Sequence, residues 1–236
     1  HLHRADGSQR QPGRLLRGGR PEHAAALADY AMHRGIAAYH DCDDSGGGFG
    51  DTLRGVAALH LEACQRAKPD QKFLGEKLFA LHRVDGWGFF ELADYVPILG
   101  ARGLARYRSI AESAWRNVPP LRPGDKDKRD GERFWITHIM EKLARHEGDV
   151  DALIAVKSRD LSRSWSFLEI AQLFAQSGRA QEAIEWARAC PRRAAGGGCL
   201  AQFLALDRGR TLPAGRDLPR RGQYRCRARR SESGRL

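Results

Sequence analysis

The chain has 236 residues, of which 42% are hydrophobic, 29% charged and 8% aromatic, and its formal net charge is +11. This apolar content suffices for a hydrophobic core and excludes a chain that is disordered throughout. No apolar run approaches the roughly 18 residues that a membrane-spanning helix needs, so the sequence predicts no membrane partner.

The positive charge is concentrated at the two ends of the chain. Residues 1–23 contain 5 Arg and 2 acidic residues, and residues 187–236 contain 13 Arg and 3 acidic residues. Residues 24–186, with 22 basic and 24 acidic residues, are nearly neutral. We therefore expect an unstructured basic segment at 1–23. The Arg/Gly/Pro-rich tail at 190–236 is expected either to be disordered and attract nucleic acid or to be out of frame.

The cysteines are odd in number and scattered, and they form no C-x-x-C pair. This pattern predicts free thiols and a cytoplasmic location rather than a disulfide framework. The five are Cys42, Cys64, Cys190, Cys199 and Cys226. Because the chain begins at His1 rather than Met, we also expect it to be a fragment or a processed product.

Helical patterns begin after the basic segment. The first predicted helix covers residues 24–40 and ends in a Gly/Asp-rich loop, DCDDSGGGFGD. The next helix is expected to begin at Asp51 or Thr52, which are both good N-caps. A third helix should begin at Pro69, because proline is tolerated at the first helical position.

Two more helices complete a first helical array at 24–116. The first is a short aromatic helix over 87–99, perturbed by Pro97, and the second covers residues 102–116. The segment that follows, 117–131, is polar and contains three prolines, so we expect an exposed linker or long loop.

The last predicted array, 132–189, also has helical periodicity. Apolar residues recur at helical spacing in 132–147, 149–158, 162–176 and 180–189. No stretch alternates with a period of two. The sequence therefore predicts an all-α fold, an irregular array of antiparallel helix pairs with disordered basic tails.

The last helix pair partly matches the tetratricopeptide pattern of aromatic and small residues around a glycine turn. The matching residues are Phe167, Ile170, Ala171, Phe174, Gly178 and Ala183. Small residues allow two helices to approach closely, and aromatic rings fill the space between them. Ala187 departs from the pattern, because an aromatic residue is usual there and Trp186 stands beside it. We expect a tetratricopeptide-like superhelix with one good unit.

Residues 24–189 resemble the helical region of bacterial SWIM zinc-finger proteins and are similar to a stand-alone domain of unknown function. The segments that carry this resemblance include DDSGGGFGD, LHLEAC, ITHIMEKLAR and GDVDALIAVKSRDLS. The resemblance implies an all-helical, tetratricopeptide-like region downstream of a zinc finger. The C-x-C and C-x-H ligands of that finger are absent from this chain, and the helical region of the family implies no catalytic residues.

Two residues are candidate metal ligands. His60 and Cys64 lie one helical turn apart, a spacing that can chelate a metal, and His40 and Cys42 are the nearest residues that could complete a set. Two ligands are too few for structural zinc, so packing of a buried His against a buried Cys is the preferred interpretation. We expect no metal and no cofactor.

Other motifs are interpreted as structural. The loop after 24–40 resembles a calcium loop, with Asp41, Asp43 and Ser45 in place, but Thr52 stands where the final Glu is needed. Ser162, Ser164 and His138 could suggest a hydrolase, but the sequence has no G-x-S-x-G nucleophile elbow. The glycine triplets at 46–48 and 196–198 follow no strand and lack the GK[ST] ending of a phosphate-binding loop.

The aromatic residues of the predicted helix over 87–99 have two interpretations. They are Trp87, Phe89, Phe90 and Tyr95. They could stack on nucleic acid bases, but their helical spacing favours the core.

The sequence favours a non-catalytic helical-repeat module, a piece of a larger bacterial protein, that binds an unidentified protein partner. The alternative is a nucleic-acid-associated region that acts through the Arg-rich tail or through a zinc finger outside this chain. Neither reading makes the chain an enzyme.

Overall fold

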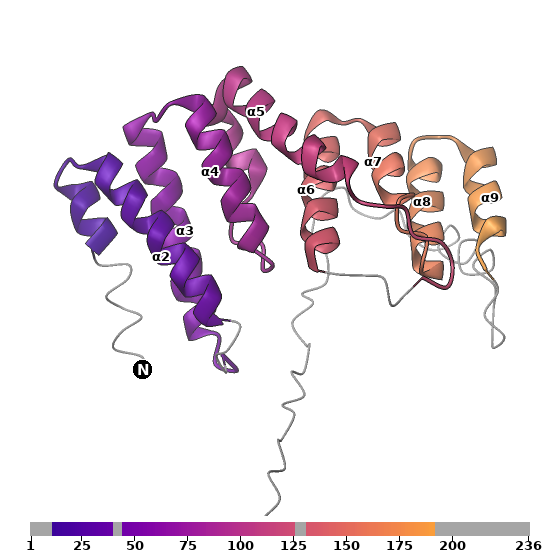
Figure 1. Ribbon diagram of the computed structural model, residues 1–236, viewed down its shortest axis with the longest axis horizontal. Coiled ribbons are helices and arrows are strands. Elements are labelled where there is room, and N and C mark those ends of the chain that lie inside the picture. Colours follow the sequence, from indigo (N-terminus) through magenta and orange to yellow (C-terminus); the bar gives the residue numbers. More distant parts are fainter. Residues whose placement is uncertain (1–10, 40–43, 126–130, 192–236) are drawn as a thin grey trace, which may run out of the picture.

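A computed structural model describes residues 11–39, 44–125 and 131–191 (Figure 1). Within these residues the fold is all-α, as predicted, and the only β-type pairing is one isolated bridge. A helical stretch at residues 11–17 comes first. The helices that follow are α2 (Pro21–Tyr39), α3 (Gly48–Ala67), α4 (Gln71–Val84), α5 (Leu92–Arg116), α6 (Gly131–Glu147), α7 (Val150–Lys157), α8 (Ser164–Gln176) and α9 (Ala180–Ala189). In this part of the chain, no helix is both long and apolar enough to cross a bilayer.

The helices follow one another along an arch, from α2 at one end to α9 at the other (Figure 1). The most extensive contacts join α2 to α3, α4 to α5, and α8 to α9. Helices two apart in the chain also touch, since α2 contacts α4, α3 contacts α5 and α4 contacts α6. Each helix hairpin therefore stacks on the next, which is how a row of hairpins buries its apolar faces.

Two main hydrophobic clusters support the arch. The larger cluster extends from Ala28 to Leu143, and the smaller extends from Ile154 to Ala187. The larger one includes Ile136 and Ile139 of α6, so α6 packs with the first array. This differs from the expected unit at 132–189, because the apolar stripe of α6 packs into the cluster shared with α4 and α5.

The start of the chain also differs from expectation. Residues 11–17 are helical, and Leu16 is buried in a small cluster with Ala24 and Ala63. The expected unstructured segment 1–23 is therefore wrong for residues 11–23. Residues 1–10 and most of the Arg-rich tail, 192–236, lie outside the described residues.

Two helices begin at other residues than predicted. The Asp44 carboxylate accepts hydrogen bonds from the backbone N–H groups of Phe49 and Gly50, at 2.9 and 2.8 Å, so α3 begins at Gly48 rather than Asp51. In α4 the N-cap is Asp70, whose side chain accepts from Phe73 N at 2.9 Å. Pro69 therefore precedes the helix instead of opening it.

The predicted aromatic helix over 87–99 is only partly helical. Trp87 to Phe90 form a non-helical connection, and α5 begins at Leu92. At Gly100, φ is 56° and ψ is −171°, and this non-helical conformation breaks α5 into two helical halves. This left-handed conformation suits glycine, because other residues carry a Cβ that it disfavours.

The helices α4 and α5 cross where two glycines meet. A Cβ atom placed on Gly75 would lie 2.5 Å from the carbonyl oxygen of Gly103, and one on Gly103 would lie 2.6 Å from that of Gln71. These are backbone atoms and cannot rotate away. The close approach of α4 and α5 therefore requires hydrogen at both positions.

The expected exposed linker at 117–131 is partly buried. Val118 and Leu121 are 8% and 3% exposed. Leu121 N donates to Arg159 O at 2.8 Å, and Leu161 N donates to Leu121 O at 3.0 Å. These two bonds form the isolated parallel bridge and attach the segment to the connection between α7 and α8.

Candidate functional site

A pocket of about 270 Å³ opens between α3 and the start of α5. Its α3 wall carries Ala57, Ala58 and Leu61, with Arg54 at one side. The opposite wall comes from the α4–α5 connection and the first turn of α5. It consists of Gly88, Phe89, Glu91, Asp94 and Tyr95. The pocket thus combines an apolar interior with three charged side chains.

Hydrogen bonds with side chains hold the backbone of the connection that forms this wall. Phe90 is 1% exposed, and its backbone N–H donates to the buried Asp85 carboxylate at 2.8 Å. Its carbonyl oxygen accepts from His82 Nε2 at 3.1 Å and from Lys142 Nζ at 2.9 Å. Three side chains thus hold the backbone N–H and carbonyl of one residue, so the pocket wall is set before any ligand arrives.

Charged neighbours compensate part of the charge at the pocket. Lys142 Nζ lies 3.1 Å from a Glu91 carboxylate oxygen, and Arg54 Nη1 lies 2.6 Å from Asp51 Oδ1. Among the described residues, no hydrogen bond or ion pair engages the Asp94 carboxylate. The carboxylate of Asp44 accepts hydrogen bonds from two backbone N–H groups, which lower its pKa. It also interacts electrostatically with Arg54. Negative charge therefore exceeds positive charge around the opening.

An aromatic group lies next to the pocket and is centred on Tyr39. Its ring centroid is 4.9 Å from Trp87, 5.6 Å from Phe49 and 6.2 Å from Phe89. Trp87 is 48% exposed, which contradicts the expectation that it belongs to the core. Trp87 lies in the non-helical connection rather than on a helix face, so helical spacing does not describe it. Phe90 and Tyr95, by contrast, are buried as expected.

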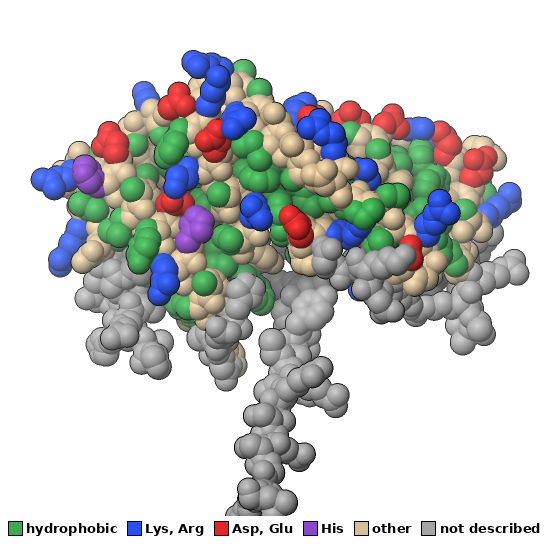
Figure 2. All heavy atoms as spheres, in the orientation of Figure 1, with side chains coloured by type: hydrophobic (Ala, Val, Ile, Leu, Met, Phe, Trp, Pro, Cys, Tyr) green, Lys and Arg blue, Asp and Glu red, His purple; other side chains and the backbone are tan. Residues whose placement is uncertain are grey.

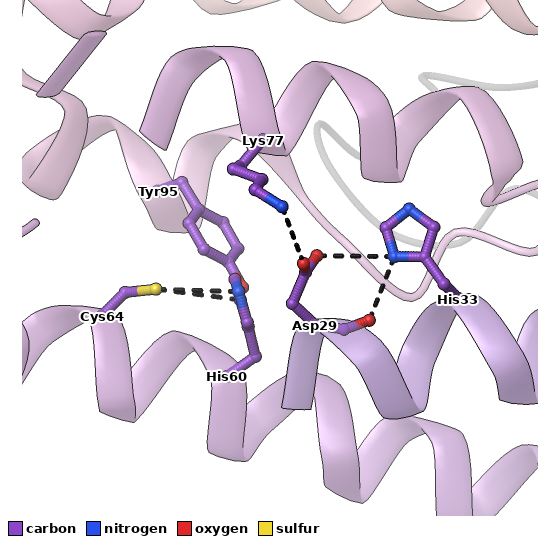
Figure 3. Close-up of polar contacts among 6 residues, drawn as sticks. All are labelled: Asp29, His33, His60, Cys64, Lys77 and Tyr95. Atoms are coloured by element: carbon purple, nitrogen blue, oxygen red, sulfur yellow. Dashed lines mark hydrogen bonds and ion pairs between the residues drawn. The ribbon is translucent and has the colours of Figure 1, made fainter. Parts of the chain in front are cut away.

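Beneath the pocket, Tyr95 meets the predicted pair His60 and Cys64 (Figure 3). His60 Nδ1 and Tyr95 Oη are hydrogen-bonded at 2.7 Å, and Cys64 Sγ lies 3.8 Å from His60 Nε2. Burial lowers the pKa of His60 to about 4 and raises the pKa of Cys64 to about 11. The imidazole is therefore neutral and the thiol protonated near neutral pH, so the thiolate that a metal would need from Cys64 is disfavoured.

Charged residues lie beside this pair. Lys77 of α4 reaches Asp29 of α2 at 3.2 Å, and His33 Nδ1 lies 3.5 Å from Asp29 Oδ1 (Figure 3). The negative charge of Asp29 opposes the effect of burial on the His60 pKa, and the Lys77 charge reinforces it. Since burial is the largest of these effects, His60 stays neutral.

A second histidine–tyrosine pair lies between α4 and α5. His82 Nε2 donates to Phe90 O, so the neutral ring accepts the Tyr107 hydroxyl at Nδ1, at 2.6 Å. Burial lowers the pKa of His82 to about 3 and raises that of Tyr107. Nothing in the sequence around His82 distinguished it, because its partners lie 8 and 25 residues away.

The other predicted site residues are not brought together. In the described part of the chain, no group of three or more His, Cys, Asp or Glu side chains is arranged to hold a metal ion. His40, Cys42, Asp41 and Asp43 lie outside the described residues. Cys64 is a free thiol, whereas Cys190 is disulfide-bonded, which contradicts the expectation of five free thiols.

The serine and histidine residues considered for catalysis are also separate. Ser162 bonds to Asp160 at 2.6 Å, Ser164 begins α8, and His138 stacks on Phe134 in α6 at 6.5 Å. Gly46 and Gly47 form the turn before α3, Gly48 begins that helix, and glycines 196–198 lie outside the described residues.

Four of the repeat-packing residues, Ile170, Ala171, Phe174 and Ala183, lie in the smaller hydrophobic cluster. Phe167, Ile170, Ala171, Phe174 and Ala183 are all buried, and Gly178 has a φ of 79° in the turn between α8 and α9. Trp186 packs against Phe167 and Phe174, with ring centroids 5.8 and 6.5 Å apart. Trp186 thus supplies the aromatic contact, while the neighbouring Ala187 is buried at the helix interface.

Comparison with other proteins identifies a family. No curated protein and no solved structure matches the chain. Residues 14–198 match a family of unknown function, DUF6880. The match includes the whole arch from α2 to α9, the pocket and both histidine–tyrosine pairs. Because it covers well over half of the 236 residues, this chain belongs to the DUF6880 family.

Proposed function

We propose that this chain is a non-catalytic helical-repeat module that binds another protein. The observation that carries the proposal is the half-exposed Trp87, which is held edge-on against Tyr39 and directly precedes Gly88 and Phe89 of the pocket wall. Tryptophan and tyrosine are enriched among the residues that dominate binding energy at protein interfaces. An aromatic ring on an anchored connection also loses little conformational freedom on binding.

The shape of the molecule supports the same proposal. Stacked helix hairpins give helical-repeat proteins extended surfaces for partners. On the face shown in Figure 2, basic and acidic side chains are interspersed around hydrophobic ones, with no single-sign charged patch. The tetratricopeptide-like arrangement and the relationship to the helical region of SWIM zinc-finger proteins are part of this proposal and rest on the sequence.

Two observations support a non-catalytic role. His60 and Cys64, the pair that most resembles a reactive centre, are 3% and 1% exposed. Their pKa values keep the imidazole neutral and the thiol protonated, so the thiolate that a nucleophilic cysteine requires is not available near neutral pH. A cytoplasmic location also belongs to this proposal; the disulfide at Cys190 counts against it.

The nucleic-acid alternative depends on parts that lie elsewhere. The Arg-rich tail is outside the described residues, and the zinc finger is not in this chain. In the described helices, several basic side chains are paired with acidic ones, including Arg66, Arg106 and Arg108. Binding through phosphate contacts would weaken steeply with added salt, whereas a protein partner held at Trp87 would show little salt dependence.

Site-specific photo-crosslinking in living cells tests the proposal. A photoreactive phenylalanine analogue replaces Trp87 in one variant and Trp165 of α8 in a control, because Trp165 is similarly exposed at 52%. We expect a discrete adduct with another protein at position 87 and none at position 165. The proposal is wrong if position 87 gives no adduct or the same adducts as position 165.

A further inference from the structure

The size of the pocket limits what it can hold. Pockets for small molecules and cofactors usually enclose about 300–1,000 Å³. The 270 Å³ of this pocket lies just below that range and is open to solvent on one side. It therefore suits one long side chain from a partner better than a cofactor.

The charges around the pocket indicate the sign of that side chain. Two acidic residues, Glu91 and Asp94, line the pocket, against one basic residue, Arg54. Arg54 is paired with Asp51 on its own helix, and Lys142 is held by Phe90 O and Glu91. Among the described residues Asp94 has no such partner, so its charge is left to attract a cation from outside into the pocket that Phe89 also lines.

Elsewhere in the molecule, a phenylalanine ring and two carboxylates already hold the guanidinium group of an arginine. The Arg179 guanidinium carbon lies 4.5 Å from the Phe174 ring centroid. Its nitrogen atoms pair with Glu182 at 2.7 Å and with Asp151. One phenylalanine ring and two carboxylates are thus arranged around one arginine. Phe89, Glu91 and Asp94 repeat this set of groups at the pocket.

From size, charge and this internal parallel, we infer that the pocket binds an arginine side chain of the partner protein. The planar guanidinium stacks on an aromatic face and pairs with carboxylates, while the apolar stem lies along Ala57, Ala58 and Leu61. The anchored Phe90 peptide keeps the wall in position. The inferred occupant specifies the chemistry of the partner within the protein-binding role proposed above.

Titration with short peptides tests the occupant directly, on the full chain labelled for NMR. The probes are acetylated, amidated pentapeptides with a central arginine, lysine or citrulline between glycines. A single exposed ion pair and a stacked cation bind weakly, so we expect a Kd on the order of 1 mM for the arginine peptide. Saturable shifts are expected at the amides of Ala57, Ala58 and Gly88, smaller ones with lysine and none with citrulline.

Two variants separate charge from shape. Asp94→Asn should weaken the arginine peptide about fivefold, the upper range for an exposed ion pair. Ala58→Leu should weaken it by filling the pocket without changing charge. The matched control is Glu112→Gln. It removes an exposed carboxylate from α5, the helix that also carries Asp94, and should leave the affinity unchanged.

The inference is overturned if the arginine peptide gives no saturable shifts, if citrulline binds equally, or if Asp94→Asn binds as tightly as the natural chain. Each of these results can occur while Trp87 still crosslinks to a partner, and then only the occupant of the pocket is wrong. Absence of the adduct at position 87 contradicts the protein-binding role separately.

Discussion

Two buried imidazoles, His60 and His82, each bond to a tyrosine hydroxyl, and this arrangement makes the molecule sensitive to acid. Both stay neutral because burial lowers their pKa values to about 4 and about 3, against the ordinary value of 6.5. The unfolded chain protonates both rings below pH 6.5, and the folded chain does not until much lower pH. Stability is therefore highest above pH 6.5 and decreases as the pH falls toward 4.

We expect the free energy of unfolding to fall by about 4 kcal/mol between roughly pH 7.5 and pH 5, about 2 kcal/mol for each histidine. Urea denaturation at the two pH values measures this difference. His82→Gln should lower stability at neutral pH and reduce the pH dependence by about half. His146→Gln, at an exposed position in α6, is the control and should leave the pH dependence unchanged.

A second prediction concerns Ala171, which is fully buried between α8 and α9. Ala171→Phe would overpack this contact with Ala183 and should cost about 1–3 kcal/mol of stability. Ala175→Phe adds the same ring on the exposed side of α8 and should leave the melting temperature nearly unchanged. Equal melting temperatures for the two variants would contradict close packing of this helix pair.

At the level of single residues, sequence reasoning succeeded where a side chain lies on a regular helix. Phe167, Ile170 and Phe174 follow one stripe, and all are buried. It failed for Trp87, since the preceding turn ends the helical pattern. The tyrosine partners of His60 and His82 were also missed, because each bond joins different helices and leaves no local signal.

Among the helices, the crossing of α4 and α5 depends on Gly75 and Gly103. Gly75→Ala places a Cβ 2.5 Å from a backbone oxygen, so the two helices must separate. We expect a loss of about 1–3 kcal/mol, measured by thermal or urea denaturation, although alanine is the better helix former.

The control for that variant is Gly48→Ala, at the first residue of α3. A Cβ there meets nothing within 4 Å, so this change should be neutral or slightly stabilising. If Gly75→Ala were equally harmless, α4 and α5 would not approach as closely as the structure indicates.

The elements themselves were largely predictable, and their ends less so. Apolar periodicity located α6, α7 and α9 within one or two residues, because caps such as Asp149 act locally. The start of α3 was misplaced because Asp44 reaches forward over three glycines to cap it. The pairing of Leu121 with residues 159 and 161 joins segments far apart in the chain, so no local pattern indicates it.

For the whole molecule, the arch is held together by apolar packing in its described part, and we expect no metal to contribute. The purified chain should contain less than about 0.1 zinc per chain, and a chelator should leave its melting temperature unchanged, since structural zinc needs four converging ligands. Elemental analysis after dialysis measures the metal. One zinc per chain, lost in Cys64→Ser, would contradict both the packing role of Cys64 and the absence of the zinc finger.

The pocket is a property of the whole molecule that sequence reasoning did not anticipate. Its walls come from residues 54–61 and 88–95, which each appear as ordinary helix or connection. They face one another only because α3 contacts α5 and because His82, Asp85 and Lys142 fix the Phe90 peptide. The pocket thus depends on contacts between segments far apart in the chain, and the spacing of residues within one segment does not predict such contacts.

The bridge at Leu121 has a mechanical consequence. Its two hydrogen bonds close a loop of chain, residues 122–158, that contains α6 and α7. When the two ends of the protein are pulled apart, tension passes through the bridge and bypasses these two helices. This holds until the two hydrogen bonds of the bridge break. The hidden length then released is at most about 3.3–3.6 Å per residue, or roughly 120–130 Å. We therefore expect this pairing of two hydrogen bonds to carry the force applied at the ends of the chain and to shield α6 and α7 from it.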